Sequence, residues 1–205
     1  MKSAVELITI IIATIFMLSC STKPEIQVQT YGVITEKNKD IIVTIDPNNY
    51  VSFDQLINRV EQIVCNDSIP TISVYNKNVE KQIGLANPCW EGVGCILIRR
   101  RNVLKIQDEK IKINETVELD SLGEYISKHY NNYGKSHFLS ENPRKARISI
   151  TYKDLPISGL KTLTKKIIEF YEIQKIETPL ILTLDRLIPP PPPPKNDEYK
   201  MNKRK

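Results

Sequence analysis

Short β-branched segments alternate with amphipathic helix patterns along the chain, and this order restricts it to a mixed α and β fold. The first expected strand is Ile41–Ile45, which is followed by turn residues. Ser52 and Gln55 then have the spacing of a capping box, and apolar residues follow at helical intervals. A second strand is expected over Thr71–Tyr75. Residues 39–78 are therefore predicted to form a β-α-β block.

A second block, residues 102–184, is predicted to run β-β-α-β-α-β. Asp120 is the expected N-cap of its first helix, and Gly134 is the expected stop. Ile96–Arg101 either extends its first strand backwards or forms a short strand of its own. The strands expected in the block are Asn102–Gln107, Lys110–Asn114, Ala146–Tyr152 and Pro179–Leu184. The predicted fold class is α+β, a small mixed sheet with helices packed on one face.

The N-terminus has the pattern of a bacterial export signal. An apolar run, Leu7–Leu18, is twelve residues long, which suits a signal peptide, whereas a membrane-spanning helix needs about 20 residues. The run ends in Met17–Cys20, which resembles the lipobox of bacterial lipoproteins. We therefore expect a signal peptide over residues 1–19 and lipid attachment at Cys20. The alternative is a signal anchor that stays in the membrane uncleaved.

After Cys20, the stretch STKPEIQVQT is polar and contains a proline, so residues 20–38 are expected to be a tether that holds the domain off the membrane. The protein is then expected in the bacterial cell envelope, anchored to a membrane and facing the periplasm.

The cysteines agree with export to an oxidising compartment. Cys89 and Cys95 flank a turn-rich loop within residues 79–101, which we expect to be a connecting segment, and we expect a disulfide between them. Cys65 lies on an apolar helix face, so it is expected to be buried and inert, with a bond to one of the other two left open. A metal site is disfavoured, because the Cys89–Cys95 spacing lacks a second pair of ligands.

Sequence motifs of catalysis are absent, and we expect no enzyme activity, no cofactor and no metal. Neither Gly-rich phosphate loops nor the common nucleophile and zinc motifs occur. His129 is expected on a helix and His137 in the following loop, without a carboxylate at regular spacing. Glu141 and Asp154 are expected to be isolated loop carboxylates. The sequence indicates no ligand-binding residues, which stay unknown.

The charge distribution disfavours nucleic acid as a partner. The whole chain has a formal charge of +5, and its last eleven residues contribute +3, with five basic and two acidic side chains. Residues 1–19 contribute zero, which leaves +2 for residues 20–194. A nucleic-acid-binding domain usually carries a basic stripe on the domain itself. Arg99–Arg101 is expected to be an exposed strand end.

Residues 185–205 are expected to lie outside the folded domain, as a proline-rich basic tail. Pro189–Pro194 is a run of six prolines, which adopts polyproline II and extends about 19 Å at 3.1 Å per residue. The tail acts either as a spacer that carries the basic tip to a partner or as an unstructured terminus.

Within the second block, two stretches resemble the periplasmic domain of the ExbD/TolR family of biopolymer transport subunits. They are KIKINETVELDSL, from Lys110 to Leu122, and RISITYKDLPISGL, from Arg147 to Leu160. The resemblance covers Asn102–Leu184. It implies a role beside a proton-driven membrane motor, a homodimer formed through the periplasmic domain, and contacts with envelope proteins or peptidoglycan. The family's membrane helix carries an aspartate, whereas residues 1–20 contain none.

Two functions follow as expectations. One is a non-enzymatic, membrane-anchored envelope protein of ExbD/TolR type that acts through protein–protein contacts. The other is a lipoprotein that serves as a binding or structural module of the envelope without a transport role.

Overall fold

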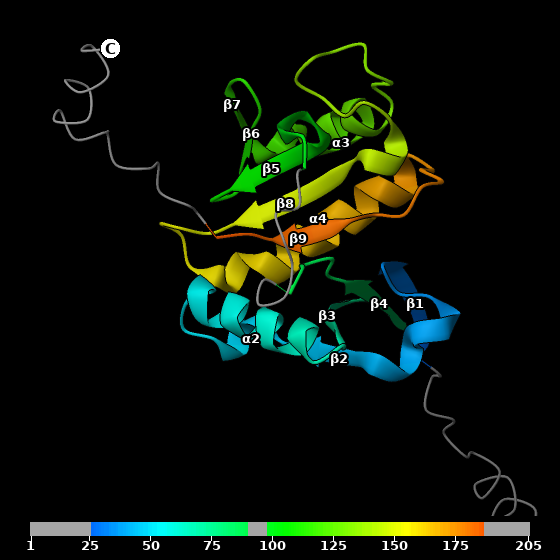
Figure 1. Cartoon of the computed structure of the whole chain (residues 1–205), viewed down its shortest axis with the longest axis vertical. Helices are drawn as coiled ribbons and strands as arrows, with labels where there is room; N and C mark the ends of the chain where they lie inside the picture. The colour runs from blue at the N-terminus through cyan, green and yellow to red at the C-terminus, as the bar shows by residue number, and fades with distance from the viewer. Residues whose placement is uncertain (1–25, 90–97, 187–205) are drawn as a thin grey trace, which may run out of the picture.

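The computed structural model describes residues 26–89 and 98–186, which form two mixed sheets and three α-helices (Figure 1). Sheet A has four strands in the order β1-β4-β3-β2, and sheet B has five in the order β7-β6-β5-β8-β9. The α+β class predicted from the sequence is confirmed. Among the described residues, no helix is both long and apolar enough to span a membrane.

Sheet A contains the predicted β-α-β block. β2 (Ile42–Ile45) leads through α2 (Phe53–Cys65) to β3 (Ile69–Asn76), and the two strands pair in parallel. Ser52 is the N-cap of α2, as the capping pattern predicts, and its side chain accepts a hydrogen bond from the backbone N–H of Gln55. The helix buries the apolar face expected from its periodicity, namely Phe53, Leu56, Ile57, Val60 and Ile63.

Two further strands of sheet A lie where the sequence predicted none. β1 (Gln27–Gly32) occupies part of the expected tether, and β4 (Val79–Gly84) occupies part of the expected connecting segment. β1 pairs in parallel with β4, which pairs antiparallel with β3. The tether prediction for residues 20–38 is therefore wrong from Gln27 onwards. Polar residues dominate β1 because it is an edge strand, so its sequence lacks the apolar alternation that marks a half-buried strand.

Sheet B contains the second block with one additional strand. β5 (Val103–Gln107), β6 (Lys110–Lys112) and β7 (Thr116–Glu118) form an antiparallel meander. α3 (Leu122–Tyr130) then connects to β8 (Arg147–Thr151), and α4 (Leu160–Ile173) connects to β9 (Leu182–Leu184). β5, β8 and β9 are mutually parallel. Apart from β7, the order is the one predicted.

The ends of α3 differ from the prediction. A 3-10 turn, η4 (Leu119–Ser121), includes Asp120, so the N-cap of α3 is Ser121. The helix ends at Tyr130 and not at Gly134, which has a positive φ of 78° in the following loop. Ile98 and Arg99 are not in a strand, and η3 (Arg100–Asn102) is a 3-10 turn. The prediction of a strand over Ile96–Arg101 is therefore wrong for residues 98–101, which the structure describes.

One hydrophobic core includes residues from both sheets. α4 packs against β3 of sheet A as well as against α3, so it lies between the two sheets. The chain after β4 joins them directly: Leu85 forms a parallel bridge with Leu182, and the backbone N–H of Ala86 donates to the Leu182 carbonyl at 2.8 Å. The Asn87 side chain donates to the Leu184 carbonyl at 2.6 Å and accepts from its N–H at 3.0 Å. The outer edge of β9 is thereby closed.

Candidate functional site

β1 forms the longest unprotected sheet edge of the described structure. It pairs with β4 from Gln27↔Val79 to Gly32↔Gly84, and no other strand within residues 26–89 and 98–186 pairs with its second edge. Its sequence, QVQTYG, contains neither a charged residue nor a proline, which are the usual means of protecting an edge. The free edges of β2 and β7 are shorter, with four and three residues. β1 is therefore the strand best suited to pair with another chain.

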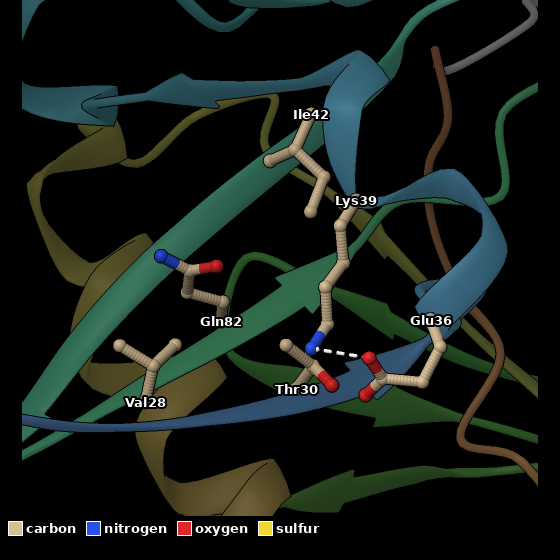
Figure 2. A pocket seen from close by; sticks show the side chains of 6 residues that line it. All are labelled: Val28, Thr30, Glu36, Lys39, Ile42 and Gln82. Carbon is tan, nitrogen blue, oxygen red and sulfur yellow. Dashed lines mark ion pairs between the residues drawn. The ribbon is translucent and has the colours of Figure 1, made fainter.

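A hollow of about 440 Å³ lies beside this edge, on the outer face of sheet A (Figure 2). Thr30 of β1 is aligned with Gln82 of β4, and Val28 lies on the same face as Thr30 because side chains alternate along a strand. The 3-10 turn η1 (Glu36–Ile41) contributes an ion pair, in which Lys39 Nζ lies 2.7 Å from Glu36 Oε2. The hollow is lined by Val28, Thr30, Glu36, Lys39, Ile42 and Gln82.

These residues offer groups that can contact a partner chain. Val28 is 54 % exposed, so an apolar side chain is open to solvent next to the free edge. The hollow contains neither histidine nor cysteine, and its acid and base are already paired with each other. Among the described residues, no group of three His, Cys, Asp or Glu side chains is placed to hold a metal.

The opposite face of β1 is fixed to α4 by a partly buried polar cluster. Lys81 of β4 is 7 % exposed, and its Nζ lies 2.6 and 2.8 Å from the two carboxylate oxygens of Glu172. The Tyr31 hydroxyl of β1 donates a hydrogen bond to the same carboxylate. Burial, together with Glu172, raises the pKa of Tyr31 above its usual range. β1 is thus held as a stable strand whose outer edge pairs with no other strand of the described residues.

The disulfide differs from the expected one. Cys89 is bonded to Cys65, with the two Cα atoms 4.9 Å apart, so the Cys89–Cys95 pairing is corrected. In the hairpin of β3 and β4, Thr71 near the start of β3 pairs with Gly84 at the end of β4. The end of α2, which directly precedes β3, therefore lies close to the segment that follows β4. Cys95 and Cys20 lie outside the described residues, so the lipid site has no structural counterpart here.

The two histidines do not form a site. His129 on α3 is buried, and its Nε2 lies 3.2 Å from the carbonyl oxygen of Asn102. Burial lowers the pKa of His129 to about 4, so it is neutral near pH 7. His137 is exposed in the loop after α3.

Glu141 is not the isolated carboxylate that the sequence suggested. It accepts from Arg99, Arg101 and Lys145, the last at 2.7 Å, and these hydrogen bonds lower the pKa of Glu141 to about 2. Sequence spacing does not reveal this cluster, because its members come from two segments about 40 residues apart.

Asp154 remains an exposed loop residue. Its backbone N–H donates to Asp108 Oδ1, which also accepts from the N–H of Lys153 at 2.7 Å. Desolvation is the largest single effect on the pKa of Asp108 and raises it, but the hydrogen bonds to its carboxylate together outweigh desolvation and lower the pKa. Asp108 therefore orders the loop after β8.

Comparisons with protein-family models, with curated proteins and with solved structures give no match for this chain.

Proposed function

We propose that this protein is an exported, membrane-anchored, non-enzymatic component of the bacterial cell envelope that acts through protein–protein contacts. The observation that carries the proposal is the free edge of β1. An extended partner segment can add a strand there, with backbone hydrogen bonds supplying affinity. Alternate side chains of that segment would face the hollow on the outer face of sheet A, which supplies selectivity.

Export is supported by the Cys65–Cys89 disulfide, because such bonds persist in oxidising compartments and are rare in the cytosol. The lipobox-like Cys20 lies six residues before Ile26, where the described structure begins. Six residues of any conformation span at most about 20 Å. The β1 edge would therefore be held close to the membrane that carries the lipid.

The partner is proposed to be an envelope protein or a second copy of this chain. Under the ExbD/TolR-type hypothesis, these protein–protein contacts would serve a proton-driven transport system. The resemblance over Asn102–Leu184 supports this hypothesis. Under the alternative hypothesis, the protein is a binding or structural lipoprotein without a transport role. Co-purification of motor subunits from native membranes favours the first, and their absence favours the second.

Two matched variants test the β1 edge. Thr30→Lys places a charge on the edge of β1, and Thr116→Lys places the same charge on the edge of β7, where Thr116 is likewise exposed. An edge charge opposes strand pairing. We expect Thr30→Lys to weaken self-association, or capture of the envelope partner, by about tenfold. Thr116→Lys should have little effect.

Sedimentation of residues 21–188 over rising concentration measures the self-association, and crosslinking in native membranes measures partner capture. Equal effects of the two variants would refute the β1 edge as the contact. Lipid attachment is tested separately, because labelled palmitate should enter the wild type and not Cys20→Ala. Equal labelling would disprove the anchor while leaving the edge intact.

A further inference from the structure

A basic surface lies at the end of sheet B where β5 and β8 begin. The two strands are parallel and in register from Val103↔Arg147, so the residues that precede them lie side by side. η3 precedes β5 and contains two arginines, and η5 (Pro143–Lys145) precedes β8 and contains an arginine and a lysine. We define the basic surface as Arg99, Arg100, Arg101, Lys135, Arg144, Lys145 and Arg147.

The charge on this surface is larger than the charge of the whole chain. Residues 98–102 and 131–147 contain seven basic side chains and one acidic side chain, a net of +6, compared with +5 for all 205 residues. The one acid, Glu141, already accepts from three of the cations. Arg100, Lys135 and Arg144 are exposed and form no ion pair with any described residue.

Two exposed aromatic side chains lie on the loop between these cations. Tyr133 is 64 % exposed and Phe138 is 56 % exposed. The loop is nevertheless well ordered by hydrogen bonds, since the Asn132 side chain donates to the Ser140 carbonyl at 2.7 Å. The loop, which follows α3, lies at the opposite end of the molecule from sheet A in Figure 1.

The loop is also fixed to the sheet from the other side. The buried Asn102 Oδ1 accepts from the Glu141 N–H at 3.0 Å and from the Ser140 hydroxyl at 3.2 Å. The aromatic side chains are therefore presented on a rigid base, which reduces the ordering cost of binding.

We propose that this basic surface binds a membrane that contains anionic phospholipids. Lys and Arg gain attraction from the negative surface potential of such a membrane, and exposed Tyr and Phe enter the boundary between headgroups and acyl chains. An acidic protein would require cations but would not require the two projecting aromatics. The contact is independent of the β1 edge and of the proposed lipid on Cys20, because the loop lies at the opposite end of the molecule from sheet A.

The experiment uses residues 21–205, which lack the lipid but retain every described residue. Sedimentation with vesicles of phosphatidylcholine alone, or of phosphatidylcholine with one third phosphatidylglycerol, measures the partition coefficient. The test variant combines Arg100→Gln, Lys135→Gln and Arg144→Gln, which leaves the Glu141 cluster intact. The control combines three exposed lysines elsewhere, Lys37→Gln, Lys77→Gln and Lys166→Gln, and has the same net charge.

We expect binding to the anionic vesicles only, and a loss of about a hundredfold in the test variant, since each basic residue contributes about fivefold. The control should lose much less than that. Phe138→Ser should lose about tenfold without any change in net charge. The same comparison in residues 21–188 removes the contribution of the basic tail.

No binding by the wild type would overturn the proposal, as would equal losses in the test and control variants. Stronger binding to soluble polyglutamate than to anionic vesicles would overturn it in favour of an acidic protein partner. Stronger binding to a single-stranded oligonucleotide would overturn it in favour of nucleic acid, because this surface supplies the basic patch on the domain that the sequence did not reveal. Circular dichroism of each variant verifies folding before the vesicle measurement.

Discussion

Removing the Cys65–Cys89 disulfide should lower stability by an amount that follows from its place in the chain. The bond closes a loop with a sequence separation of 24, for which chain entropy gives about 3.5 kcal/mol. Both cysteines are half-buried, so replacement by serine creates no fully enclosed cavity. For a domain of this size, 1 kcal/mol corresponds to about 2–4 °C in Tm, so the double variant should melt about 7–14 °C lower.

Thermal melts of the double variant Cys65→Ser/Cys89→Ser under non-reducing conditions measure the shift. Cys95→Ser is the matched control, and it should melt within about 1 °C of the wild type, because it removes a thiol and no crosslink. Reduction with dithiothreitol should lower the Tm of the wild type to that of the double variant. Peptide mapping that finds Cys89 bonded to Cys95, or a Tm shift in the control equal to that of the double variant, would show that the Cys65–Cys89 bond does not stabilise the domain as expected.

Four other outcomes are expected. The pKa of His129 is about 4 in the folded protein, below its value of 6.5 in the unfolded chain. Neutral His129 therefore contributes to the free energy of unfolding above pH 6.5, and this contribution is lost as the pH falls towards 4. Urea unfolding should show about 2 kcal/mol more loss between pH 7 and pH 5 in the wild type than in His129→Gln. Asn102→Ala removes two hydrogen bonds at a buried oxygen and should cost about 2 kcal/mol, with faster amide exchange at Glu141. Glu172→Ala leaves the buried Lys81 ammonium unpaired and should cost about 3 kcal/mol in urea unfolding, whereas Lys81→Met should cost clearly less. Deletion of residues 189–205 should change the Tm by less than about 2 °C, since the tail is expected to lie outside the core, and a larger loss would show that it packs on the domain.

The elements that the sequence predicted well are those whose pattern is local. α2 has a capping residue, an apolar stripe and turn residues in front of it, so its start at Phe53 and its buried face follow from spacing alone. β8 and α4 were predicted for the same reason, since Ile148 and Ile150 alternate in β8 and α4 buries apolar residues at helical spacing, although β8 also buries Ser149 and Thr151.

The elements that were missed depend on contacts made by distant residues. β1 is polar, and it forms a strand because its backbone pairs in parallel with that of β4. β4 in turn forms because it pairs with β3. The helix stop at Gly134 was wrong because the Asn132 side chain bonds to the Ser136 and Ser140 carbonyls, which orders the chain as a loop.

The α+β class, the helix faces and the order of elements in the second block follow from the amino-acid sequence, because they depend on hydrophobic period and capping within a few residues. Three features required the folded structure: the partner of Cys89, the unpaired edge of β1 among the described strands, and the position of the basic surface. Each of these depends on strand pairing between distant segments: Thr71 with Gly84 for the disulfide, β1 with β4 for the edge, and Val103 with Arg147 for the basic surface. The spacing of residues along the sequence does not predict such pairings, because their register is set by the packing of the whole core.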